Sequence, residues 1–236
     1  LLKVIKLQPK LSDAYSNLGL LFGELGRLED AISYLRKALQ LRSDSIDYLC
    51  SLSIFLKDSG DLIEAKDVIL RAIMIKPDSA KAHNNYGLIL KKLGEFEKAK
   101  NSLLLAVKYQ PNSSQFISNL AIIYRDLGDL DQAYMHIQKA IKLEPKYIKP
   151  YINCGSILIE MGSLNEAEKI TLHALNINPL SDKLYCNLSM IQKGLRKYDT
   201  AKQSILKAIN INPKYAIAFS NLAGIYHDLG EFDNGL

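Results

Sequence analysis

Hydrophobic residues recur along this chain with a period of 34 residues, and every period contains two stripes of helical spacing. We number the positions of one period from 1 to 34 so that residues 80–113 form one period. Positions 3, 4, 7, 8, 10, 11 and 14 are mainly apolar, which is the broad face of an α-helix and not the alternation of a strand. Positions 20, 24, 27, 28 and 30 form a second stripe. The pattern therefore predicts two helices in every period.

Four columns of small or helix-breaking residues mark the ends of these predicted helices. Glycine at position 15 supplies a left-handed residue that ends the first helix, and proline at position 32 ends the second. Alanine fills positions 20 and 27 in each of six periods, so helices can approach closely there. The proline column is Pro77, Pro111, Pro145, Pro179 and Pro213; the glycine column is Gly26, Gly60, Gly94, Gly128, Gly162 and Gly230. A period shared by four columns indicates stacked copies of one structural unit.

These columns resemble the signature of the tetratricopeptide repeat family. That signature has a bulky residue at position 4, leucine at 7, glycine at 8, tyrosine at 11, alanine at 20 and 27, an apolar residue at 24 and proline at 32. The first complete period matches it at Tyr15, Leu18, Gly19, Phe22, Ala31, Leu35 and Ala38. The resemblance covers essentially the whole chain. It implies an all-α fold, a right-handed superhelical solenoid of antiparallel helix pairs whose first helices line a concave groove.

The period also predicts how the chain is divided. Residues 1–11 are expected to end a preceding repeat, and residues 216–236 to begin a truncated seventh one. The six complete repeats are expected over 12–45, 46–79, 80–113, 114–147, 148–181 and 182–215. Neither end carries the polar capping helix that solenoids use for solubility. We therefore expect a fragment of a longer protein, and the uncapped ends allow end-to-end self-association.

One departure from the pattern lies in the sixth repeat, where Arg196 occupies the glycine column. An arginine in the left-handed region costs roughly 1 kcal/mol. One interpretation is a slightly irregular turn, with Gly194 letting the chain turn differently. The other is a bend or a ligand-dependent joint at this repeat.

Composition and charge narrow the class of protein. The chain has 236 residues, of which 48% are hydrophobic, and its net charge of +5 is spread among interleaved acids and bases. This is typical of a solvated surface rather than a nucleic-acid footprint. No apolar run reaches the roughly 18 residues of a membrane helix, so we expect no membrane partner. Cys50, Cys154 and Cys186 are too scattered for a disulfide framework or a zinc site. We expect an intracellular, reducing and cytoplasmic location.

The sequence shows no catalytic constellation. His83 falls in the packing column at position 4, and His136 and His173 fall at different positions of the second helix. None of them stands at metal-ligand spacing from cysteines or carboxylates. The glycines end helices and do not form a phosphate-binding loop. We therefore predict no enzymatic activity, no metal site and no cofactor.

An asparagine column is the strongest candidate for a binding surface. Position 6 is asparagine in six of the seven repeats, although asparagine is a middling helix former. By the helical pitch, positions 2, 6, 9 and 13 lie within about 60° of one another, on a face away from the apolar stripe. An amide offers both a donor and an acceptor, so a row of amides can pair with peptide main chain. The alternative is a consensus residue that bonds within its own repeat. The column is Asn17, Asn85, Asn119, Asn153, Asn187 and Asn221.

Two neighbouring columns complete the predicted peptide-binding surface. Position 12 supplies cations at Lys57, Lys91, Arg125 and Lys193. Position 9 is aliphatic in the first four repeats and then becomes Ser156, Met190 and Gly224, which predicts an apolar rail that opens into a roomier C-terminal half. The alternatives are a mixed solvated face for the cations and contacts between neighbouring helices for position 9.

These columns lead to a prediction of function. The family's carboxylate-clamp variety is excluded because no repeat has asparagine at position 9 or arginine at position 6. The asparagine column instead resembles the repeat arrays that precede the catalytic domain of O-linked N-acetylglucosamine transferases, with DAYSNLG at 13–19 and AFSNLA at 218–223. We predict a protein–protein interaction module that binds an extended polypeptide or peptide in its concave groove. The alternatives are a substrate-recruiting arm of an attached glycosyltransferase and, disfavoured by the 34-residue period and mild charge, an RNA-binding helical repeat.

Overall fold

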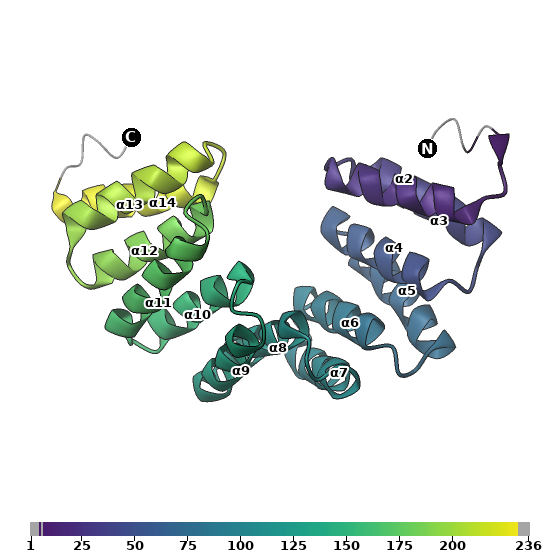
Figure 1. The fold of residues 1–236 in the computed structure, drawn as a ribbon, viewed down its shortest axis with the longest axis horizontal. Coiled ribbons are helices and arrows are strands. Elements are labelled where there is room, and N and C mark those ends of the chain that lie inside the picture. The colour runs from purple at the N-terminus through teal and green to yellow at the C-terminus, as the bar shows by residue number, and fades with distance from the viewer. Residues whose placement is uncertain (1–4, 6, 231–236) are drawn as a thin grey trace. The chain divides into compact units, whose positions relative to one another are not determined.

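The computed structural model describes residue 5 and residues 7–230, and within that part the regular structure is entirely α-helical (Figure 1). This confirms the predicted all-α helical repeat array. Residues 1–4, 6 and 231–236, at the two ends of the predicted repeat division, lie outside the described residues. The helices are α2 (Ser12–Glu24), α3 (Leu28–Leu41), α4 (Ile46–Ser59), α5 (Leu62–Ile75), α6 (Ala80–Lys92), α7 (Phe96–Tyr109), α8 (Ser114–Asp126), α9 (Leu130–Leu143), α10 (Ile148–Glu160), α11 (Leu164–Ile177), α12 (Asp182–Gly194), α13 (Tyr198–Ile211) and α14 (Ala216–Leu229).

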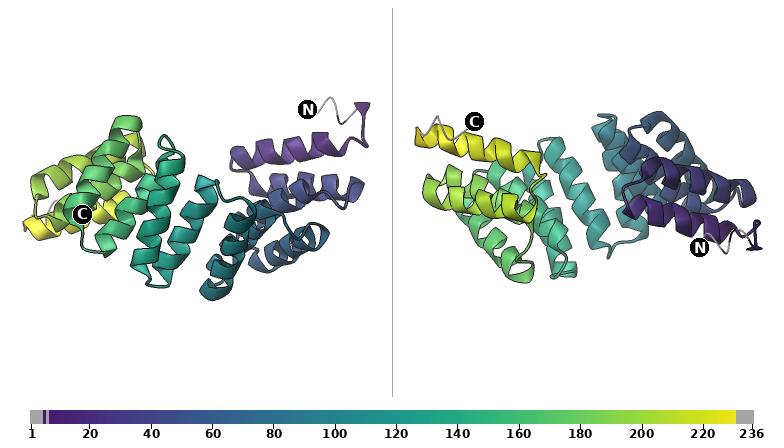
Figure 2. Two further views of the ribbon diagram at one scale, coloured as in Figure 1. Left: turned by 60° about the horizontal axis from the view of Figure 1, so that its bottom comes forward. Right: turned by 90° about the horizontal axis from the view of Figure 1, so that it is seen from above.

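Even-numbered helices are the predicted first helices of the repeats, and odd-numbered helices are the second ones. The chain forms two compact units, residues 1–123 and 124–236, and the boundary lies inside α8. Within the first unit, each of the helices α2 to α6 packs on the next one, and α4 also contacts α2 and α6. Within the second unit, each of the helices α9 to α13 packs on the next one, and α12 also contacts α10 and α14 (Figure 2).

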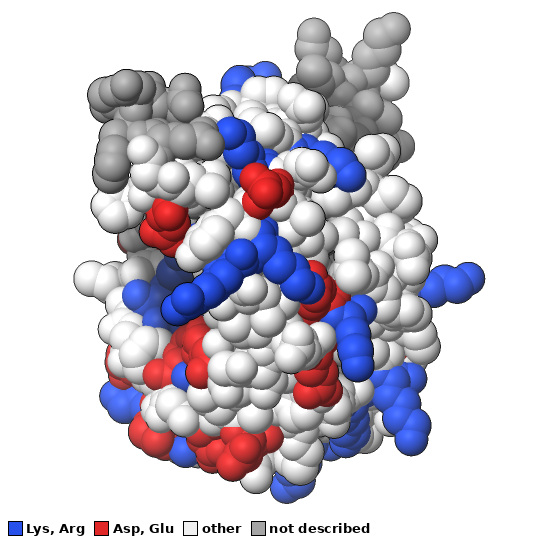
Figure 3. All heavy atoms as spheres, turned by 90° about the vertical axis from the view of Figure 1, so that its left-hand side faces the viewer, with Lys and Arg blue, Asp and Glu red and all other residues white. Residues whose placement is uncertain are grey.

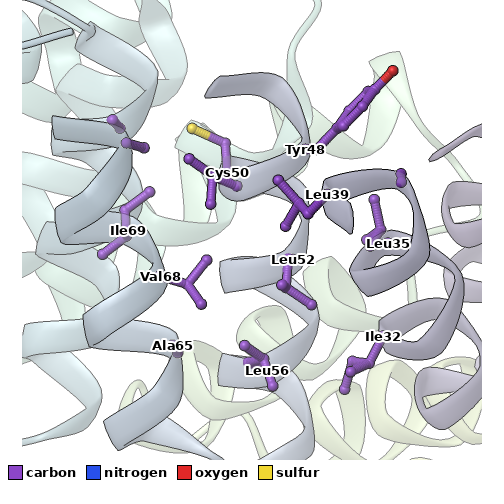
Figure 4. Close-up of a cluster of buried hydrophobic side chains, with 14 of the residues drawn as sticks. Ile32, Leu35, Leu39, Tyr48, Cys50, Leu52, Leu56, Ala65, Val68 and Ile69 are labelled. Carbon is purple, nitrogen blue, oxygen red and sulfur yellow. The ribbon is translucent and has the colours of Figure 1, made fainter. Parts of the chain in front are cut away.

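The two alanine columns form the centre of the packing between helices. All twelve of these alanines are 0% exposed. In the first unit, side chains of α4 such as Leu52 and Leu56 lie between those of α3 and those of α5, where Ala65 and Ile69 meet them (Figure 4). Because an alanine methyl group occupies little space, the larger residues of the neighbouring helices can fill the interior at native density.

Position 8 is small because the two helices of a repeat nearly touch there. A Cβ atom at Gly19 would lie 2.8 Å from Cγ of Leu35, and one at Gly87 would lie 2.7 Å from Cγ of Leu103. Such distances are too short for an unperturbed contact. The glycines therefore set how closely α2 approaches α3 and α6 approaches α7.

The turn at Arg196 is regular although the residue is not glycine. Arg196 has φ 60°, in the same left-handed region as the column glycines. Its N–H donates to the Lys193 carbonyl at 2.9 Å, and the next N–H, of Lys197, donates to the Gln192 carbonyl at 2.8 Å. Gly94 makes the equivalent bond, to the Lys91 carbonyl at 3.1 Å. The irregular turn that the sequence allowed is therefore not formed, and the arginine retains a strain of roughly 1 kcal/mol.

Candidate functional site

The column asparagines all lie on even-numbered helices, but their exposure differs. Asn17 is exposed, Asn85 and Asn119 are buried with 5% exposure each, and Asn153, Asn187 and Asn221 are half-buried. We call the surface made by positions 6, 9 and 12 of the even-numbered helices the asparagine face. The two buried members, Asn85 and Asn119, are therefore less accessible to a ligand than the rest of the column.

In the first unit, the asparagine amides form a hydrogen-bonded chain across three helices. Asn119 of α8 donates to Oδ1 of Asn84 at 2.8 Å, and Asn84 donates to Oδ1 of Asn85 at 3.3 Å. Asn85 of α6 donates in turn to the Cys50 carbonyl of α4 at 3.2 Å. Asn84, at position 5, was missed by the sequence analysis. The signal in the sequence that could have revealed it is the pair of consecutive asparagines, Asn84 and the column residue Asn85.

The second unit repeats the same connection. Asn187 of α12 donates to the Ile152 carbonyl of α10 at 2.9 Å, and Asn221 of α14 donates to Sγ of Cys186 of α12 at 3.1 Å. In both units the acceptor belongs to position 5 of the preceding even-numbered helix, 35 residues earlier. The bonds donated by these four amides therefore join neighbouring repeats, and the alternative of a bond within one repeat does not describe them.

These bonds orient the amides and leave part of their hydrogen-bonding capacity for a ligand. A primary amide has two N–H donors and a carbonyl oxygen with two lone pairs. Each inter-repeat bond uses one donor and fixes the direction of the side chain. The second donor remains on Asn187 and Asn221, together with the oxygen, so each amide can still pair with a peptide group.

The predicted cations at position 12 are paired with acids. Lys57 lies 2.6 Å from Asp58, Arg125 lies 2.8 Å from Asp126, and Lys193 lies 3.2 Å from Asp228. A hydrogen bond from Lys193 holds the pKa of Asp228 below its usual range, with a further contribution from His227. Lys91 is half-buried at the same position of α6. These positive charges are therefore largely compensated.

Basic and acidic side chains also lie next to one another elsewhere on the surface (Figure 3). Lys81 of α6 contacts Asp47 of α4 at 3.0 Å, so an acid of one repeat meets a base of the next. The mixed pattern matches the solvated face that the sequence analysis offered as an alternative.

The asparagine face is closed between α4 and α6 and open between α12 and α14. Between α4 and α6, a cavity of only about 10 Å³ is lined by residues that include Ile54, Lys57 and Leu88. Between α12 and α14, the equivalent positions, which include Gly224, line a pocket of about 480 Å³. Glycine at position 9 of α14 replaces a leucine side chain, and this is the position from which the sequence predicted a roomier C-terminal half.

Three of the histidines lie against aromatic rings and the three cysteines lie in the interior, whereas His173 and His227 are exposed to solvent. Among residues 7–230 and residue 5, no group of three or more His, Cys, Asp or Glu side chains could hold a metal ion. His83, His136 and His173 each lie against a tyrosine ring, of Tyr109, Tyr124 and Tyr151 respectively. All three cysteines are buried free thiols.

Burial also governs the ionisation of the thiols. It raises the pKa of Cys50 to about 11 and that of Cys154 to about 12, and it raises the pKa of Cys186 as well. Thiols of this kind stay protonated and are poor nucleophiles near neutral pH. Their place in the structure is a packing role.

Comparison with known proteins identifies the family. Models described as tetratricopeptide repeat match residues 12–45, residues 124–185, and residues 80–113 together with 182–215. These matches cover more than half of the sequence, and the chain belongs to the tetratricopeptide repeat family. No curated protein sequence matches it.

Solved structures show the same fold at low sequence identity. The chain is similar to one in the Cut9–Hcn1 hetero-tetramer of the APC/C, with a TM-score of 0.82 and 13% identity over 94% of this chain and 44% of that one. It is similar to PilF of Pseudomonas aeruginosa, with a TM-score of 0.70 and 22% identity over 90% and 97% of the two chains. It is also similar to YrrB, described as a TPR protein with an unusual peptide-binding site, with a TM-score of 0.55 and 18% identity over 79% and 96%.

These likenesses fit a protein-interaction scaffold. The chain spans less than half of the Cut9–Hcn1 chain. None of the helices in the described part is long and apolar enough to cross a lipid bilayer.

Proposed function

We propose that this chain binds an extended polypeptide along the asparagine face of its repeats. The observation that carries the proposal is the pair of half-buried amides of Asn187 and Asn221, at one equivalent place in two successive repeats, each held in direction by its bond to the preceding even-numbered helix. An amide fixed in this way meets a peptide group without first losing side-chain freedom. Preorganisation of this kind increases affinity.

The spacing of the helices suits an extended ligand. Packed helices lie ~8–10 Å apart, and an extended chain advances ~3.3 Å per residue. Asn187 and Asn221, on successive even-numbered helices, therefore meet ligand residues that are about three positions apart. Because the amides pair with main-chain groups, recognition along this face tolerates many sequences.

The charge arrangement favours a polypeptide over RNA. Binding of a nucleic acid requires cations that can neutralise phosphates. On the asparagine face, Lys57, Arg125 and Lys193 already have acidic partners. The three buried free thiols are consistent with a reducing, intracellular place of action.

A salt titration tests this function. We expect immobilised protein to retain random-sequence peptides with an affinity that changes less than about tenfold between 50 and 200 mM salt, because the paired groups are mainly neutral. A ligand that contacts 6–10 phosphates would lose about 10³–10⁵ in affinity over the same range. Fluorescence anisotropy with labelled peptide and labelled polyuridine measures both. Tight, salt-sensitive binding of polyuridine together with no binding of peptide would reject the proposal.

A further inference from the structure

The pocket between α12 and α14 is the largest departure from the repeat pattern on the asparagine face. Its volume is about 480 Å³, against about 10 Å³ for the cavity at the corresponding positions of α4 and α6. Gly224 helps to open it, since it stands where α6 has Leu88, and a Cβ atom there would approach Nζ of Lys193 in the pocket wall. The pocket therefore distinguishes the sixth and seventh repeats from the second and third.

The pocket wall includes Arg196, which occupies the turn position where the other repeats have glycine. Arg196 is exposed and has a left-handed conformation. Backbone strain of this kind gathers at functional sites. In the described part of the chain, Arg196 has no acidic partner, whereas Lys193 contacts Asp228 at 3.2 Å and the Gly224 carbonyl at 3.1 Å.

The remaining polar groups of the pocket can also donate to an anion. Tyr198 and Ser220 contribute hydroxyl groups, and Asn221 contributes its amide. The charges of Lys193 and Asp228 offset each other, so the guanidinium of Arg196 leaves one positive charge without compensation. An arginine fork binds a carboxylate through two parallel hydrogen bonds.

We propose that this pocket binds one acidic side chain, aspartate or glutamate, of the polypeptide held on the asparagine face, with Arg196 as its charged partner. The inference rests on the proposed function. Asn221 belongs both to the asparagine column and to the pocket wall, so main chain paired with Asn221 places an adjacent side chain at the opening. The site adds selectivity for one acidic residue to a face that otherwise tolerates many sequences.

Two peptide libraries of about twelve residues, long enough at ~3.3 Å per residue to span several repeats, test the inference. One has a fixed central glutamate and the other a fixed central glutamine, and the flanking positions exclude acidic residues. Immobilised protein is expected to retain the glutamate library about tenfold better, as for a hydrogen bond between charged groups.

Three variants assign that preference to the pocket. Arg196→Gly removes the guanidinium and gives the turn its usual residue, so the fold is retained and the preference is lost. Gly224→Leu places in α14 the leucine that α6 has at the same position. The fold tolerates it, because the new Cβ atom approaches only Nζ of Lys193, at 3.1 Å, which is the end of a flexible side chain. It too is expected to abolish the preference. Lys139→Gln, at an exposed site on α9, removes the same charge elsewhere and is expected to leave the preference unchanged.

The outcomes separate the two proposals. Equal retention of both libraries by the wild type, or a preference that survives Arg196→Gly, would overturn the acidic subsite and leave peptide binding intact. Retention of neither library would reject the proposed function and the subsite together.

Discussion

Replacing Asn153, Asn187 and Asn221 together by alanine is expected to weaken peptide binding by about 1.5–4.5 kcal/mol, since each amide bond contributes a net ~0.5–1.5 kcal/mol. All three are half-buried members of the column in the second unit. Each has polar capacity beyond a single inter-repeat bond. Isothermal titration with a peptide retained by the wild type measures the loss.

For Asn187 and Asn221, the folding cost of this substitution is small. The acceptor of Asn187 is a carbonyl within α10 that Ser156 also contacts, at 3.3 Å, so no buried group is left alone. The acceptor of Asn221 is a thiol sulfur, which is a weak acceptor. Alanine is also the better helix former.

A matched control removes three asparagines from exposed sites on odd-numbered helices. These are Asn101, Asn176 and Asn210. Their replacement by alanine changes the composition in the same way and is expected to leave peptide affinity unchanged. Equal affinity of the two triple variants, with both still helical by circular dichroism, would place the ligand away from the asparagine face.

Leu120→Ala is expected to lower the free energy of unfolding by about 2–5 kcal/mol, because it leaves a cavity in a packed interior. Leu120 is 0% exposed. Its neighbour Asn119 has a different role, and Asn119→Ala is expected to cost about 1–3 kcal/mol, because Oδ1 of Asn84 then lacks its donor while only 2% exposed.

Chemical denaturation followed by circular dichroism compares the two variants. Adding Asn84→Ala to Asn119→Ala removes the stranded acceptor, so the two costs should fail to add, as expected for residues in one network. Strict additivity would show that the amide chain of the first unit contributes nothing as a unit.

The local structure could be predicted because it depends on features that repeat in sequence. Glycine at position 15 predicts the helix ends, and the alanine columns predict the buried contacts. Each of these follows from the backbone and volume requirements of a single position. The boundary between the two units inside α8 has no such signal, because no linker or change of composition marks it.

The geometry of the candidate site was less predictable because it depends on distances between helices. The period places Asn85 and Asn119 on one face, but only packing shows that they are buried and joined through Asn84. The acids that pair with Lys193 and Arg125 come from the same helix or from a neighbouring even-numbered helix. The column of cations in the sequence therefore predicts more uncompensated positive charge on this face than the structure has. The α12–α14 pocket forms where Gly224 of α14 faces Lys193 of α12 and Arg196 of the following turn.

The side-chain amide resonances of the asparagines offer the most direct measurement of polypeptide binding on the asparagine face. A ¹⁵N-labelled sample is titrated with a peptide from the retained library, and single Asn→Ala variants assign the signals. We predict that the amide signals of Asn187 and Asn221 shift in proportion to bound peptide, while those of Asn101, Asn176 and Asn210 stay in place. Shifts confined to the odd-numbered helices, with Asn187 and Asn221 unchanged at saturation, would contradict the account.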